Sequence, residues 1–73
     1  VYPSPVRHRL YIRGDIGNIE EVRISDTAGQ TLIVDKQVIP GEGINVSSLS
    51  KGIYFIMIKT DNEVIQQKFM KID

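Results

Sequence analysis

The sequence contains no cysteine and no tryptophan, and only one histidine, His8. Without cysteine the chain can form neither a disulfide scaffold nor a thiolate metal site. One histidine leaves a catalytic triad or a multi-histidine metal site without support. Nine Lys and Arg residues are balanced by nine Asp and Glu residues, whereas nucleic-acid binders usually carry a basic surplus. We therefore expect no cofactor, no metal and no nucleic-acid partner.

Long hydrophobic segments are also missing. The longest apolar run covers residues 53–58, whereas a membrane-spanning helix needs about 20 residues. Residues 1–5 lack the basic start and the apolar stretch of a signal peptide. Because the chain opens on Val1 and not on methionine, we expect it to be a piece of a longer protein. Its 73 residues predict a single domain, residues 1–73.

Glycine and proline recur at short intervals, and the residues between them are rich in Val, Ile, Tyr and Phe. This pattern predicts short strands joined by turns. We expect strands over residues 9–13, 19–26, 31–36, 44–46, 53–60 and about 64–72. Such spacing indicates an all-β fold, either an antiparallel sandwich or a small barrel, and we favour a reduced sandwich.

Two local patterns predict defined backbone structure. Residues 26–29 are typical of a type I hairpin turn, because Asp26 can accept backbone hydrogen bonds and Gly29 tolerates a positive φ. The order Leu49, Gly52, Tyr54 resembles the tyrosine corner of β-sandwiches, where the hydroxyl bonds to backbone a few residues upstream. We favour this structural role of Tyr54 over a catalytic one.

The corner also sets the phase of strand 53–60. If Tyr54 points into the core, alternation places Ile56 and Ile58 there too. The opposite face then carries three apolar side chains: Ile53, Phe55 and Met57. A sandwich strand normally has polar residues on that face. Either a loop or the N-terminal segment with Val1 and Tyr2 folds over these side chains, or they form a docking surface for an upstream domain, a second copy or a receptor.

The two ends of the chain are less regular. Lys68 and Lys71 fall on opposite faces of the last strand, and neither face is cleanly apolar, so we expect a bulge or a twisted edge. Edge lysines would discourage strand-to-strand aggregation. Because Pro3 and Pro5 cannot donate to a strand ladder, we expect residues 1–9 to form an extended, polyproline-like lead-in on the sandwich surface.

The only cationic cluster is residues 7–9 (Arg-His-Arg), with Arg13 nearby. Read functionally, it would meet phosphates or anionic lipid headgroups. We favour a solvated cluster, because the net charge is zero and three acidic residues offset it: Asp15, Glu20 and Glu21.

Taken in order, these features resemble the C-terminal sorting domain of the type IX secretion system. Residues 2–5 (Tyr-Pro-Ser-Pro) are similar to the family's opening Tyr-Pro-Asn-Pro, and residues 10–12 and 22–30 match its first strands and Asp turn. Residues 44–54 match its strongest block, and residues 68–72 resemble its basic-apolar ending. The motif-matched positions implied in recognition are Tyr2, Pro3, Pro5, Asp26, Gly29, Leu49, Gly52, Tyr54, Lys68 and Lys71.

The resemblance implies a small immunoglobulin-like sandwich of about seven strands, without enzyme activity, at the end of a larger cargo protein. It implies recognition by the outer-membrane translocon after export to the periplasm. A cysteine-type sortase would then remove the domain before or near Val1 and join the cargo to an anionic lipopolysaccharide. Self-association of the domain stays open. The alternative is a non-catalytic accessory sandwich that binds carbohydrate or spaces a neighbouring domain.

Overall fold

In the computed structural model, residues 1–12, 18–39 and 41–72 are described. These residues form six strands: β1 (Arg9–Leu10), β2 (Ile19–Ser25), β3 (Thr31–Asp35), β4 (Ile44–Asn45), β5 (Gly52–Thr60) and β6 (Val64–Lys71). The expected strands are all present, although the first is reduced to two residues. None of the described residues forms a helix that is long and apolar enough to cross a membrane.

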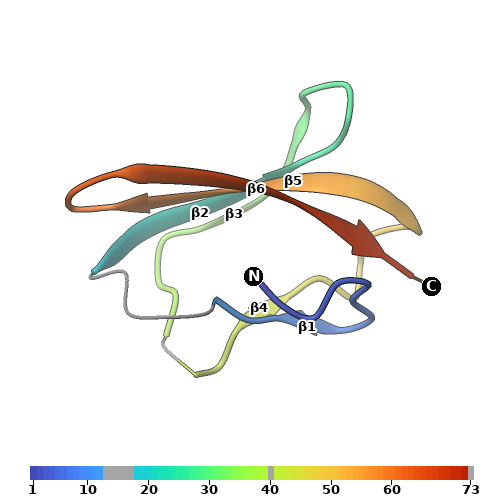
Figure 1. Ribbon diagram of the computed structural model, residues 1–73, viewed down its shortest axis with the longest axis horizontal. Helices are drawn as coiled ribbons and strands as arrows, with labels where there is room; N and C mark the ends of the chain where they lie inside the picture. The colour runs from blue at the N-terminus through green and yellow to red at the C-terminus, as the bar shows by residue number, and fades with distance from the viewer. Residues whose placement is uncertain (13–17, 40, 73) are drawn as a thin grey trace.

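The strands form two antiparallel sheets (Figure 1). The larger sheet has the order β3-β2-β5-β6, and the smaller sheet pairs β1 with β4. In Figure 1 the small sheet and the N-terminal segment lie on the same side of the large sheet. The prediction of a small all-β antiparallel sandwich is therefore confirmed. The described residues hold six strands and not about seven, and an immunoglobulin-like topology stays a prediction.

The core lies between the two layers. It consists of eleven buried apolar residues: Val6, Leu10, Val22, Ile24, Ile44, Val46, Leu49, Tyr54, Ile56, Ile58 and Phe69. Burying such side chains stabilises the fold by roughly 1.5–3 kcal/mol each, before the entropy cost of ordering the chain. The alternation expected of strand 53–60 is confirmed, since Tyr54, Ile56 and Ile58 all point into this core.

The pairing of the neighbouring strand β3 with β2 determines which of its side chains face the core. Ile33 lies opposite the buried Ile24, and cross-strand partners share a face of the sheet. Ile33 therefore packs against the core, whereas Leu32 and Val34 stay exposed. The large sheet thus has an inner face toward the core and an outer face to which Val34 belongs.

The hairpin turn between β2 and β3 has the predicted form. The Oδ1 atom of Asp26 accepts hydrogen bonds from the backbone N–H groups of Ala28 (3.0 Å) and Gln30 (2.9 Å). The N–H of Gly29 donates to the carbonyl oxygen of Asp26 at 3.1 Å, and Gly29 has a φ of 86°. Only glycine takes this conformation without a Cβ penalty, so the expectation for residues 26–29 is confirmed.

The N-terminal segment differs from the expected polyproline-like lead-in. The chain bends at Ser4 and Pro5, and the peptide bonds before Pro3 and Pro5 are cis. Tyr2 pairs with Tyr11, and Val6 pairs in parallel with Lys71. The backbone of Val6 hydrogen-bonds with Met70 of β6 and with Ile72 just after it, and its apolar side chain is buried in the core. The lead-in is therefore part of the folded unit and not only a segment on its surface.

The expected bulge in the last strand is wrong. The register of β6 against β5 runs from Val64 to Lys71 without a shift, whereas the irregularities lie in β2 near Ile19 and Ile24. The mixed faces of β6 arise because its inner face carries Phe69 and Lys71, and both side chains are buried there. β6 is nevertheless an edge strand of the large sheet, as expected.

Candidate recognition surface

Several of the motif-matched residues have structural roles at the corner before β5. The hydroxyl of Tyr54 donates a hydrogen bond of 2.6 Å to the carbonyl oxygen of Ser50, which confirms the predicted tyrosine corner. The ring of Tyr54 stacks on Phe69 with centroids 5.8 Å apart. Leu49 is buried in the core, and Gly52 begins β5. These residues shape the domain, as Asp26 and Gly29 do at the hairpin, and a direct role of theirs in recognition stays a prediction.

The two motif-matched lysines of β6 lie in opposite environments. Lys71 is 1% exposed, and its Nζ atom donates a hydrogen bond of 3.2 Å to the carbonyl oxygen of Ile72. Lys71 therefore cannot act as a protective edge lysine, because its side chain lies inside the molecule. Lys68 is exposed on the outer face and lies opposite Phe55 in the β5–β6 register. Of the two lysines, only Lys68 has a charged group that a partner protein can contact.

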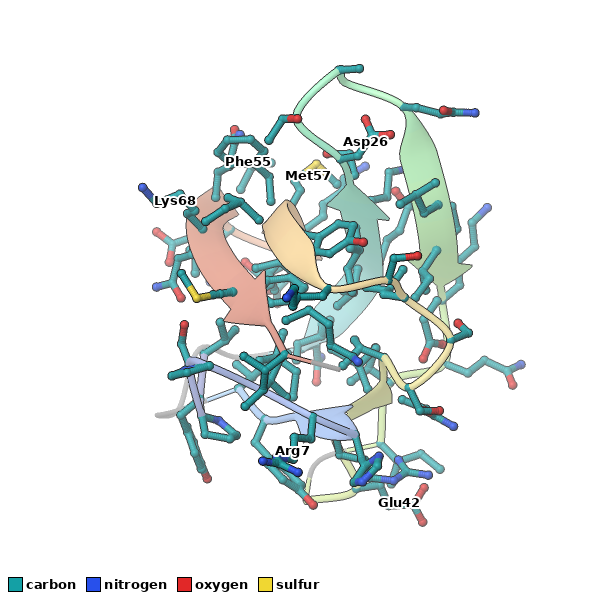
Figure 2. The ribbon with its side chains drawn as sticks, turned by 90° about the vertical axis from the view of Figure 1, so that its right-hand side faces the viewer. Arg7, Asp26, Glu42, Phe55, Met57 and Lys68 are labelled. Atoms are coloured by element: carbon teal, nitrogen blue, oxygen red, sulfur yellow. The ribbon has the colours of Figure 1, made fainter. Side chains whose placement is uncertain are left out.

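The outer face of the large sheet carries the apolar side chains expected there. Ile53, Phe55 and Met57 are half-buried. Figure 2 shows Phe55, Met57 and Lys68 together on one side of the sheet. We call this group, the three apolar residues with Lys68, the outer patch. Met57 lies between the polar residues Arg23 and Gln66, whereas Ile53 lies opposite Met70, whose exposed side chain extends the apolar surface.

The N-terminal segment does not cover the outer patch. The amino nitrogen of Val1 donates a hydrogen bond of 2.6 Å to Oε1 of Gln67, and the side chain of Val1 packs against the core. Gln67 lies opposite the buried Ile56 and so belongs to the inner face. The idea that residues 1 and 2 fold over the outer patch is therefore wrong, because the lead-in is anchored on the other side of the sheet.

Ion pairs on β2 border the outer patch. Nε of Arg23 lies 2.5 Å from Oε2 of Glu21, and Nζ of Lys36 lies 3.9 Å from Oε1 of the same carboxylate. The hydrogen bond from Arg23 lowers the pKa of Glu21, although partial burial opposes this shift, and the same bond raises the pKa of Arg23. Lys68 makes no ion pair within the part of the chain that the structure describes. The ammonium group of Lys68 is therefore the charge in the outer patch that can pair with a carboxylate of a partner protein.

The motif-matched residues of the lead-in lie at a second surface. An open hollow of about 510 Å³ is lined by Pro3, Pro5, Arg7, His8, Arg9, Tyr11 and Ile72. Tyr2 lies beside it, with its ring centroid 5.7 Å from that of Tyr11. Figure 2 places Arg7 and Glu42 at the end of the molecule opposite Phe55, so the structure does not bring the two groups of predicted residues together.

The charges around the hollow differ from the expected arrangement. An Nη atom of Arg9 donates a hydrogen bond of 2.9 Å to the backbone carbonyl oxygen of Glu42. Glu21 is occupied by Arg23, and Glu20 lies 4.0 Å from Lys59, so neither offsets the cationic cluster at residues 7–9. Sequence proximity was a poor guide, because β2 turns these carboxylates toward its own neighbours. Asp15 and Arg13 lie outside the described residues.

Sequence reasoning missed the contact between the lead-in and β6. The Oγ atom of Ser4 accepts a hydrogen bond of 3.2 Å from the N–H of Met70, and the N–H of Val6 donates to the carbonyl oxygen of Met70 at 2.8 Å. The nearest signal in the sequence is the single apolar Val6 between Pro5 and the cationic cluster.

Comparison with known families gives one finding that covers nearly the whole chain. The model of the family described as "Secretion system C-terminal sorting domain" matches residues 1–72. Searches of curated proteins and of solved structures gave no significant match.

Proposed function

The chain belongs to the family of secretion system C-terminal sorting domains, and we propose that the outer-membrane translocon of type IX secretion recognises it as a folded signal through its outer patch. The observation that carries this proposal is the family match over residues 1–72. The family supports a sorting signal attached to an upstream cargo and export toward the cell surface. It is a signal family and not a catalytic one, so the domain acts by being recognised.

The outer patch has the composition of a protein-binding surface. Its three apolar side chains are only half-buried in the domain itself, although they lie at the centre of the large sheet. An apolar centre with a polar rim is typical of protein interfaces. Lys68 at the rim favours a partner that presents an apolar segment with a nearby carboxylate.

A reporter fusion tests this proposal. Residues 1–73 are fused to the C-terminus of a periplasmic reporter in a cell that has the type IX system, and surface exposure of the reporter is measured by protease accessibility. The double substitution Phe55→Lys and Met57→Lys should leave the reporter in the periplasm. The matched control is Val34→Lys, which puts a lysine on the same face of the same sheet but on the edge strand β3, with Arg23 of β2 between it and Met57. Surface display by the double variant at the wild-type level would refute the role of the patch.

The variants must be shown to fold, because Phe55 and Met57 are half-buried. Circular dichroism and urea unfolding of the isolated chain serve this purpose. Lys68→Glu is a milder second variant at an exposed position, and it should reduce export without loss of stability. Deleting residues 68–73 would not separate signal from fold, since it removes Phe69 and Lys71 from the interior.

The proposal includes a covalent step at the upstream junction. A sortase cuts the chain before or near Val1 and anchors the cargo at the cell surface. Mass spectrometry of the released domain should find its new N-terminus at or upstream of Val1. A terminus beyond Val6 would contradict the proposal, because Val6 is buried and paired with β6 in the folded domain.

A further inference from the structure

The exposed edge of β6 is covered along only part of its length. The lead-in occupies its C-terminal end: the N–H of Val6 donates to the carbonyl oxygen of Met70, and the N–H of Ile72 donates to the carbonyl oxygen of Val6. Upstream of Ser4 the backbone pairs elsewhere, since Tyr2 pairs with Tyr11. Val1 contacts β6 again, and the hydrogen bond that its amino nitrogen donates goes to the side chain of Gln67 and not to the backbone of the edge. Residues 64–68 pair with β5 on one side and with no strand of the described residues on the other.

The contacts of Met70 fix the direction of the backbone groups along this edge. Both its N–H and its carbonyl oxygen point away from β5, toward the lead-in. In an antiparallel pair, alternate residues share this orientation. The N–H and C=O groups of Val64, Gln66 and Lys68 therefore also point outward from the sheet. They offer a regular ladder without a bulge, which is a template for another strand.

We infer that the occupant of this edge is a second copy of the same edge, paired antiparallel about a two-fold axis at Gln66. This arrangement places Gln66 opposite Gln66 of the second copy and Val64 opposite Lys68 of the second copy. All three residues then face their partners with outward-pointing backbone groups, as a ladder requires. The two large sheets join into one continuous sheet, and the contact is isologous.

The arrangement fits the edge in length and in charge. The uncovered stretch is bounded by the bends at Asp61 and Asn62 and by the lead-in at Met70, and Gln66 lies at its centre. A two-fold axis at Lys68 would place the Lys68 residues of the two copies opposite each other, and the second copy would collide with the lead-in. An axis at Gln66 instead sets each lysine against an exposed valine, so that no like charges meet. The other edge strand, β3, is less suited because its pairing with β2 is irregular near Leu32.

Charge substitutions at Val64 give the sharpest test, read by sedimentation equilibrium of the whole chain over a range of concentrations. Val64→Glu creates two symmetric pairs with Lys68 and should tighten the dimer roughly two- to thirty-fold. Val64→Lys opposes like charges and should weaken the dimer by a similar factor. The matched control is Val34→Lys, at an exposed valine of the opposite edge strand, and it should leave association unchanged.

A backbone variant tests the ladder itself. Gln66→Pro removes an N–H that points away from β5, so it should abolish dimerisation while the domain stays folded. Hydrogen exchange of the Gln66 amide, followed by NMR, should slow with rising concentration of the wild-type chain. A wild-type chain that remains monomeric at all concentrations, a dimer that survives Gln66→Pro, or equal effects of Val64→Lys and Val34→Lys would each overturn the inference.

Discussion

The hydroxyl of Tyr54 and the carbonyl oxygen of Ser50 are joined by a hydrogen bond of 2.6 Å that ties β5 to the corner before it. The bond is partly buried, so its loss leaves a carbonyl oxygen that water reaches poorly. The ring of Tyr54 also stacks on Phe69 of β6. One side chain thus joins the corner, β5 and the last strand.

Removing only this hydroxyl should therefore be measurable. We expect Tyr54→Phe to lower the free energy of unfolding by about 1 kcal/mol, because the ring contacts remain and one hydrogen bond is lost. Tyr54→Ala should cost roughly 3–5 kcal/mol, since it also opens a cavity in the core. Urea unfolding followed by circular dichroism measures both. Equal stability of the wild type and Tyr54→Phe would show that the corner bond contributes nothing.

The hairpin turn gives a second prediction. Asp26→Ala removes the acceptor of two backbone N–H groups and should destabilise the domain by roughly 0.5–2 kcal/mol, as for comparable capping residues. Asp26→Asn keeps an oxygen at this place and should recover most of the loss. The neighbouring Thr27→Ala is the control and should lie within about 0.5 kcal/mol of the wild type. Thermal unfolding of the three variants decides the outcome.

The contrast between the two lysines of β6 gives a third prediction. Lys71→Ala should lower the free energy of unfolding by roughly 1–3 kcal/mol, because a buried side chain and its hydrogen bond to Ile72 are lost. Lys68→Ala should change stability by less than about 0.5 kcal/mol, since Lys68 is exposed. A reversed order of the two variants would contradict the burial of Lys71.

A fourth prediction concerns pH. The hydrogen bond from Arg23 holds the pKa of Glu21 below its usual value in the folded domain. The folded state then binds this proton more weakly than the unfolded state, whose Glu pKa is about 4.3. The stabilisation is fully present above that value and is lost as the pH falls through the lower folded pKa.

Urea unfolding between about pH 7 and pH 3 measures this dependence. In Glu21→Gln the free energy of unfolding should fall less as the pH decreases, because this variant has no carboxylate to protonate at position 21. Arg23→Gln should reduce the same part of the decline, since it removes the donor that lowers the pKa of Glu21. If the free energy of unfolding of both variants kept the pH dependence of the wild type, the assignment of this dependence to Glu21 would be refuted.

The features that the sequence predicts well are local. The turn at residues 26–29 and the corner at Tyr54 depend on a few adjacent residues and on the period of one strand. The outer position of Phe55 and Met57 followed from the same period once Tyr54 was set inward. The burial of Lys71 was within reach by this logic, since it shares a face with Phe69, but its charge argued against it.

The features that the sequence left undetermined depend on long-range pairing. β3 has apolar residues on both faces, with Leu32 and Val34 on one and Ile33 beside Asp35 on the other. Its register against Ile24 decides that Ile33 faces the core. The course of the lead-in depends on hydrogen bonds between Val6 and the far end of the chain. No local pattern near Pro3 or Pro5 encodes such a partner. The separation of the outer patch from the cationic hollow is likewise a property of the assembled sheets.

The pairing of Val6 with Met70 and Ile72 joins the beginning of the domain to its end. Because Phe69 also completes the core, a cargo whose synthesis stops before the last strand lacks the folded domain. A ribosome makes β6 after the other strands, so this fold forms only on chains that have been translated at least through that strand. Under the proposed role as an export signal, a cargo chain truncated before β6 would carry no signal and would not be exported.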